Sequence, residues 1–141
     1  MIAYLDTSAL VPLLVDEPSS PACERLWNEA DEIVSGRIAY VEAAAALAQA
    51  RRSGRLSPHS QRAATVYLDE KWQQMQIVEV DQLLMNRAAA LADTHGLRGY
   101  DATHCAAAES INDDALVAAS GDAALLAAWR ALGMNTLDTN S

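Results

Sequence analysis

Residues 2 to 8 are Ile2-Ala3-Tyr4-Leu5-Asp6-Thr7-Ser8, an apolar run that ends at a carboxylate and two hydroxyls. A short apolar run bounded in this way is typical of a strand that is buried on both faces. Further short apolar runs occur at residues 33–34, 76–80, 115–119 and 134–137. Because stretches with helical spacing separate these runs, the sequence predicts an α/β domain with a central parallel sheet.

The stretches between the predicted strands carry helix signals, such as Ser57-Pro58 at a start and Gly96 at an end. Helices are expected over residues 7–15, 20–30, 37–52, 57–75, 81–94, 101–110 and 123–132. We expect the helix at 37–52 to be buried, because it is apolar on nearly every side. A length of 141 residues suits a single core, so one domain over residues 1–141 is predicted, with 138–141 as a loose tail.

The composition, 51% hydrophobic and 21% charged, is typical of a soluble globular protein. No apolar run approaches the ~18–20 residues of a membrane span, and no basic segment precedes a long apolar one, so neither a membrane span nor a secretory signal is expected. Cys23 and Cys105 lack metal-site spacing and are expected to be reduced and buried in a cytoplasmic protein. The helical spacing of Trp27, Trp72 and Trp129 favours packing in the core or a dimer interface over base stacking.

The net charge of −9 argues against a general nucleic-acid binder, because such proteins usually carry a basic surface. It favours a basic protein partner, and any nucleic-acid site must be locally basic. The single basic cluster is Arg51, Arg52 and Arg55. Either these arginines are a solvated helix end that complements the helix dipole, or they follow the phosphates of a nucleic acid.

Four acidic residues, Asp6, Glu42, Asp101 and Asp122, occur in apolar surroundings with few cations near them in the sequence. A lone buried carboxylate costs several kcal/mol unless it is paired, protonated or bound to a metal. Asp6 and Asp122 each follow a predicted strand, and ligands of open parallel sheets bind outside the carboxyl ends of the strands. Glu42 and Asp101 can face the same edge. If the four converge, Mg²⁺ or Mn²⁺ is the simplest compensating ion, and without metal at least one carboxyl group should have a raised pKa.

Each acid also has a simpler interpretation. Asp6, Asp101 and Asp122 each stand where a helix cap would stand, and aspartate caps helices well. Glu42 could face water, although its neighbours on every side are apolar. Taken together, four acids after strands and in apolar helices indicate a shared site.

Four polar residues near these acids are candidates for supporting roles. Thr7 and Ser8 are caps or hydrogen-bond partners of a ligand rather than ligands. Ser120 could order a metal-bound water or cap the turn after its strand. His104 lies on the same helical face as Asp101, and we expect it to support the site rather than bind metal, because hard ions seldom need imidazole.

The chain resembles the PIN domain family, and specifically the VapC-type toxins of bacterial toxin–antitoxin pairs. The resemblance covers nearly the entire chain, and the four acids occur in the family's order. One departure is Ser120, where a threonine is common. The segments that carry the resemblance are Tyr4-Leu5-Asp6-Thr7-Ser8-Ala9-Leu10, Glu42 with Ala46-Leu47, Leu97-Arg98-Gly99-Tyr100-Asp101-Ala102-Thr103-His104-Cys105-Ala106-Ala107-Ala108, and Ser120-Gly121-Asp122 with Leu125 and Gly133.

The resemblance implies a three-layer α/β/α PIN-like domain and a Mg²⁺- or Mn²⁺-dependent endoribonuclease. It implies Asp6, Asp101 and Asp122 as direct or water-mediated metal ligands, and Glu42 as a ligand or as the group that orients the attacking water. It further implies a homodimer neutralised by a cognate antitoxin, whose C-terminal segment covers the acidic site. Operator DNA would be bound through the antitoxin.

Three other functions are weaker. Asp6-Thr7-Ser8 mimics the signature of aspartic proteases, but that chemistry belongs to β-rich folds and this chain is rich in helices. A hydrolase of small phosphate esters is disfavoured by the lack of a P-loop or a GxGxxG turn. A non-catalytic metal-binding protein is the remaining alternative.

Overall fold

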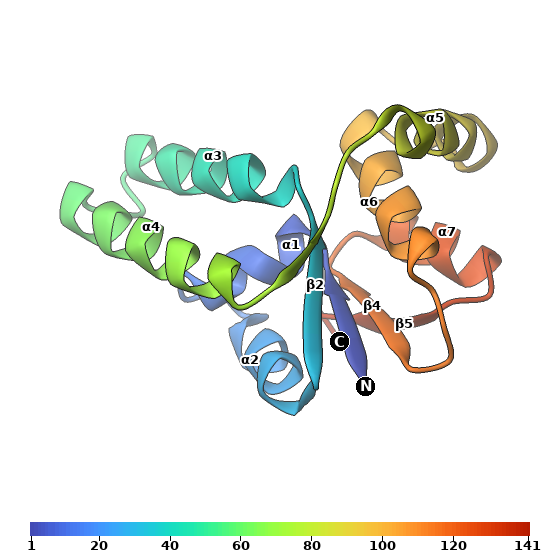
Figure 1. Ribbon diagram of the computed structural model, residues 1–141. Coiled ribbons are helices and arrows are strands. Elements are labelled where there is room, and N and C mark those ends of the chain that lie inside the picture. The colour runs from blue at the N-terminus through green and yellow to red at the C-terminus, as the bar shows by residue number, and fades with distance from the viewer.

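The computed structural model describes residues 1–141 and contains one sheet of five parallel strands in the order β3-β2-β1-β4-β5 (Figure 1). The strands are β1 (Ile2–Leu5), β2 (Glu32–Gly36), β3 (Gln76–Val78), β4 (Leu116–Ser120) and β5 (Asn135–Asp138). The central β1 pairs with β2 on one side and with β4 on the other, where Leu5 lies opposite Ala119. The predicted parallel sheet is confirmed.

Helices cover both faces of the sheet, as Figure 1 shows. The elements are α1 (Thr7–Leu10), the 3₁₀ turn η1 (Val11–Leu13), α2 (Ser20–Glu29), α3 (Ala39–Arg52), α4 (Pro58–Gln73), α5 (Gln82–His95), α6 (Gly99–Ser110) and α7 (Ala123–Ala131). The first four helices lie on one face and α5 to α7 on the other, which gives the expected three layers. The helix predicted at 7–15 changes to η1 because Pro12 has no backbone N–H to donate. None of the helices combines the length and the apolar character that a bilayer crossing needs.

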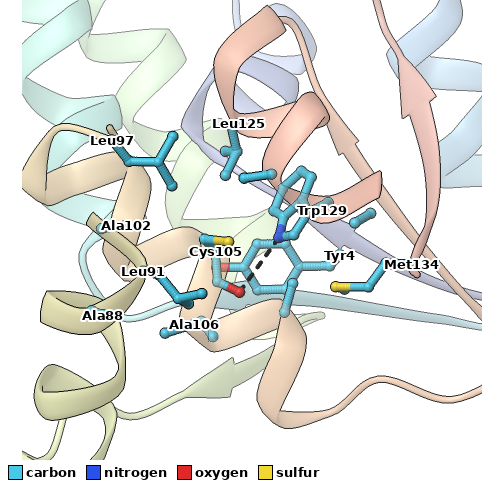
Figure 2. Close-up of a cluster of buried hydrophobic side chains, with 14 of the residues drawn as sticks. Tyr4, Ala88, Leu91, Leu97, Ala102, Cys105, Ala106, Leu125, Trp129 and Met134 are labelled. Atoms are coloured by element: carbon cyan, nitrogen blue, oxygen red, sulfur yellow. Dashed lines mark hydrogen bonds between the residues drawn. The ribbon is translucent and has the colours of Figure 1, made fainter. Parts of the chain in front are cut away.

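The two faces of β1 belong to two separate cores. Tyr4 points into the core formed with α5, α6 and α7, whereas Leu5 points into the core formed with α1 to α4. Trp129 fills the centre of the first core, with its ring edge-on to Tyr4 at 6.0 Å and its Nε1 donating to the Cys105 carbonyl (Figure 2). The strand prediction for residues 2–5 is therefore correct, and so is the core position of Trp129.

The two cysteines are free and buried, as predicted. Cys23 lies in the core of the α1–α4 face and Cys105 in the core of the opposite face, so the sheet separates them. Burial raises the pKa of the Cys23 thiol to about 11 and that of Cys105 to about 12. Trp27 and Trp72 are partly buried against the α1–α4 core.

Two predictions about burial are wrong. Helix α3 buries only one face, and Val41 on its other side is 64% exposed, because an alanine run makes a helix apolar all round without making it buried. Residues 138–141 are also not a loose tail. Asp138 pairs with Ser120 in the sheet, and Thr139 is 3% exposed, because β5 carries this segment to the edge where the other strands end.

Candidate active site

The four acids lie around the carboxyl edge of the sheet. Asp6 follows β1 and Asp122 follows β4, and these strands are neighbours. Glu42 is in the first turn of α3, the helix after β2, and Asp101 is in the first turn of α6. Parallel strands with short connections bring all four to one side of the domain.

Asp6 is the most buried of the four, with 4% exposure. Its Oδ1 accepts hydrogen bonds from Ser8 Oγ at 2.7 Å and from the Ala9 backbone N–H at 3.0 Å, so Asp6 does cap α1. Burial raises the pKa of the Asp6 carboxyl, although nearby His104 and the bonds from the two serines and Ala9 oppose the rise. The direction agrees with the sequence-based expectation, but the cause is desolvation rather than repulsion between carboxylates.

The two serines join the turn after β1 to the turn after β4. Ser120 is fully buried, and its Oγ donates to Asp6 Oδ2 at 2.5 Å and accepts the Asp122 N–H at 2.9 Å. Ser8 Oγ accepts the Gly121 N–H at 2.7 Å. Of the two interpretations of Ser120, turn capping is the one that these contacts support. The two serines thus fix the turns that carry Asp6 and Asp122 relative to each other.

Glu42 is held by a chain of hydrogen bonds that reaches the core. Its Oε1 accepts from Thr7 Oγ1 at 2.7 Å and lies 2.8 Å from His104 Nε2. His104 is 2% exposed, and its Nδ1 lies 2.8 Å from the Tyr4 hydroxyl. Because a carboxylate only accepts, His104 Nε2 carries a proton and donates it to the hydrogen bond with Glu42. Burial also keeps that hydroxyl protonated by raising the Tyr4 pKa.

These contacts set the charge of Glu42. Burial alone would raise its pKa, but the hydrogen bonds from His104 and Thr7 outweigh burial, so the pKa of Glu42 lies below its usual range. Both contacts are made to Oε1, which leaves Oε2 free to accept a further hydrogen bond. His104 therefore contacts Glu42, in the supporting role expected for it from the sequence.

Asp101 and Asp122 share a cation that the sequence-based reasoning overlooked. Arg98 Nε lies 3.2 Å from Asp101 Oδ2, and its Nη2 lies 3.6 Å from Asp122 Oδ2. Arg98 precedes Asp101 by about one helical turn and is the one Lys or Arg side chain that pairs with any of the four acids. Asp122 caps α7 through the Leu125 N–H, whereas Asp101 lies inside α6 and is not its cap.

The expected gathering of all four acids as one metal centre is not seen. No three His, Cys, Asp or Glu side chains come close enough together to hold a metal ion. Asp6 and Glu42 direct oxygens at protein donors, whereas Asp101 and Asp122 face one cation. Carboxylate oxygens are suitable ligands for Mg²⁺ and Mn²⁺. The Arg98 guanidinium shows that the position between Asp101 and Asp122 accommodates a positive charge. This pair is therefore the part of the site that suits a divalent ion.

A cleft of about 440 Å³ lies beside the acids. Most of its lining residues are of polar types, and they include Thr7, Ser8, Thr139 and Asn140 beside Gly121. The Thr139 hydroxyl oxygen is buried without a hydrogen-bond partner. Because Thr7 and Ser8 directly follow Asp6 and Gly121 directly precedes Asp122, the cleft adjoins the acidic site.

The basic cluster lies at the far end of α3 from Glu42. Arg51 and Arg52 are exposed in the last turn of this helix, so they complement its dipole. Arg55 lies 3.6 Å from Glu17, which also lines the cleft. The structure thus places one of the three arginines at the border of the cleft and does not bring the cluster to the acids.

A family model described as the PIN domain matches residues 3–139 of the chain. Ribonuclease VapC45 of Mycobacterium tuberculosis is 36% identical over 132 residues, which cover 94% of this chain and 92% of the relative. Ribonuclease VapC3 of Pyrobaculum aerophilum is 33% identical over 113 residues, which cover 79% of this chain and 84% of the relative.

Solved structures share the fold at lower identity. The structure of FitAB bound to an IR36 DNA fragment has a TM-score of 0.72 at 17% identity and covers 100% of this chain and 96% of that chain. VapC20 of Mycobacterium tuberculosis, described as a toxin that cleaves the sarcin–ricin loop, has a TM-score of 0.68 at 18% identity and covers 94% and 95%. The match to the family model, the relatives at a third identity or more and the shared α/β/α layers show that this chain belongs to the PIN domain family.

Proposed function

We propose that this protein is an endoribonuclease that depends on Mg²⁺ or Mn²⁺ and acts as the toxin of a toxin–antitoxin pair. The observation that carries the proposal is the pair Asp101 and Asp122, which face one cation at the carboxyl edge of the sheet. The names of the curated relatives, which are ribonucleases, support the choice of RNA as substrate.

Each acid has a distinct task in this proposal. Asp101 and Asp122 would hold the divalent ion, and Asp6, fixed by Ser8 and Ser120, keeps a lone pair on Oδ2 for the ion or its water. Glu42 is ionised at neutral pH because its pKa is lowered, and its free Oε2 can orient the attacking water and accept a proton from it. A bound divalent ion would favour deprotonation of that water and offset charge on the phosphate.

The proposed partners follow from charge and surface. The net charge of −9 favours a basic antitoxin segment over the acidic edge and argues against direct DNA binding, so we assign operator DNA to the antitoxin. The exposed apolar side chains of Val41, Val66 and Tyr67 on α3 and α4 support a protein interface, in a homodimer or with the antitoxin. We place this activity in the cytoplasm.

Cleavage of a labelled single-stranded RNA tests the proposal. The purified wild type should cut the RNA with Mg²⁺ and lose activity in excess EDTA. Asp101→Asn and Asp6→Asn should each lower the rate by about 100-fold or more, because each weakens the hold on the ion. Asp114→Asn is the matched control, because Asp114 is exposed near the start of β4, at the opposite edge of the sheet.

Full activity of the wild type in EDTA would refute the mechanism. Full activity of Asp6→Asn or of Asp101→Asn would also refute it. The alternative of a non-catalytic metal-binding protein predicts Mn²⁺ binding without cleavage of any RNA. Hydrolysis of a small phosphate ester with RNA left intact would identify the other alternative.

A further inference from the structure

Arg98 holds an unusual position between two of the acids. Its guanidinium contacts Asp101 and Asp122, which belong to different helices, α6 and α7. The side chain is 79% exposed, while the two carboxylates it contacts are 15% and 29% exposed. A solvent-exposed cation thus lies between two partly buried carboxylates.

Few contacts hold the guanidinium in place. Arg98 occupies the cap position of α6, where a guanidinium has no acceptor for a backbone N–H, and the two aspartates are its only charged partners. The aspartates, in contrast, belong to rigid elements, and Asp122 is fixed by its bond to the Leu125 N–H. Moving Arg98 therefore exposes the carboxylate pair without disturbing the helices.

We propose that Arg98 is a built-in counter-cation that competes with the divalent ion for Asp101 and Asp122. The guanidinium offsets one of the pair's two negative charges in the metal-free protein, and a divalent ion must displace it. One site cannot hold both charges, because like charges at such short range repel. The idea rests on the proposed function for the identity of the ion, but it concerns ion binding and needs no RNA cleavage. Arg98 is in this sense a positioning residue.

Isothermal titration with Mn²⁺ tests the competition. Arg98→Gln should bind Mn²⁺ about three- to tenfold more tightly than the wild type, as expected from the loss of two exposed ion pairs. Arg98→Lys, which keeps the charge but not the paired N–H groups, should fall between the two. Arg87→Gln is the control: Arg87 pairs with Glu109 at the far end of α6, so the substitution removes the same charge from an ion pair outside the site.

A second measurement follows the arginine itself. The Nε–H cross-peak of Arg98 in an NMR spectrum, assigned by its absence in Arg98→Gln, should move when Mg²⁺ is added, while that of Arg87 stays. A structural role for Arg98 predicts no such movement.

The outcomes separate this inference from the proposed function. Equal or weaker Mn²⁺ binding by Arg98→Gln overturns the competition, and so does an equal gain in Arg87→Gln, which would show a general charge effect. Neither result would contradict the proposal that the wild-type protein cleaves RNA with a divalent ion. No Mn²⁺ binding by either protein would overturn both ideas, whereas binding by Arg98→Gln alone would show strong competition.

Discussion

Asp6 is the side chain whose surroundings conflict most with its charge. It is 4% exposed, and burial raises its pKa even though Ser8, Ser120 and the Ala9 N–H all donate to it. A carboxylate that loses more in desolvation than it gains from hydrogen bonds destabilises the fold. Sites kept for chemistry often carry such a penalty.

This penalty predicts that Asp6→Asn is more stable than the wild type at neutral pH, by about 0.5–2 kcal/mol. Below the unfolded pKa of about 3.9, Asp6 is protonated in both the folded and the unfolded protein, so its burial carries no charge penalty and the full stability is present. Part of that stability is lost as pH rises through the raised pKa of Asp6 in the folded protein. Urea denaturation at acidic and at neutral pH measures the difference, which should vanish in acid. A variant that is less stable at neutral pH would contradict the prediction.

The packing of β2 against α6 depends on the absence of a side chain at Gly36. A Cβ at this position would lie 2.9 Å from the Tyr4 hydroxyl and 3.7 Å from His104 Nδ1. Tyr4 is fully buried and rests against Trp129, so its ring cannot move aside. Because Gly36 has no side chain, Tyr4 can keep its contact with His104, which in turn contacts Glu42.

Gly36→Ala should therefore destabilise the protein by about 1–3 kcal/mol, measured by urea denaturation, because overpacking a buried site forces strain on its neighbours. The matched control is Gly99→Ala at the start of α6, where nothing lies within 4 Å of the added carbon. It should be neutral or stabilising by up to about 1 kcal/mol, because alanine favours the helix.

A double-mutant cycle locates the strain. Removing the hydroxyl with Tyr4→Phe relieves the clash, so the Gly36→Ala/Tyr4→Phe protein should lose less stability than the sum of the two single variants. Strictly additive losses would show that the alanine acts somewhere other than at the Tyr4 hydroxyl.

Charge is unevenly spread over the domain. The acids gather at the carboxyl edge, whereas Arg51 and Arg52 lie at the far end of α3, and Arg55 borders the cleft through Glu17. A chain with a net charge of −9 repels RNA at long range, so attraction must come from such local groups. We expect an RNA strand to run from the acids past the cleft to these arginines.

Replacing Arg51, Arg52 and Arg55 by alanine should weaken RNA binding and reduce the slope of log affinity against log salt by up to about two units, the value for three phosphate contacts on a single strand. The control is alanine at three other exposed arginines, Arg25, Arg87 and Arg130, which gives the same net charge. Fluorescence anisotropy over a salt series measures both. An unchanged slope would leave the cluster as a helix end that only complements the dipole.

The sequence predicted much of the fold because short apolar runs and helix caps are local signals. It also placed Asp6 and Asp122 correctly at the ends of β1 and β4, since the boundary between an apolar run and a carboxylate is visible in the chain. The burial of α3 and the order of residues 138–141 were mispredicted, because both depend on which neighbour covers a segment rather than on its own composition.

The order of strands and helices, the parallel sheet and the identity of the four acids follow from local patterns in the chain. The pairing within the site does not, because it joins residues far apart: Thr7 to Glu42 across 35 residues and Ser120 to Asp6 across 114. Even Arg98, which occupies the cap position of α6 one turn before Asp101, reaches Asp122 through packing of α6 beside α7. Which acid contacts a hydroxyl, an imidazole or a guanidinium depends on distances in the folded chain, and these contacts decide which carboxylate oxygens remain available to an ion.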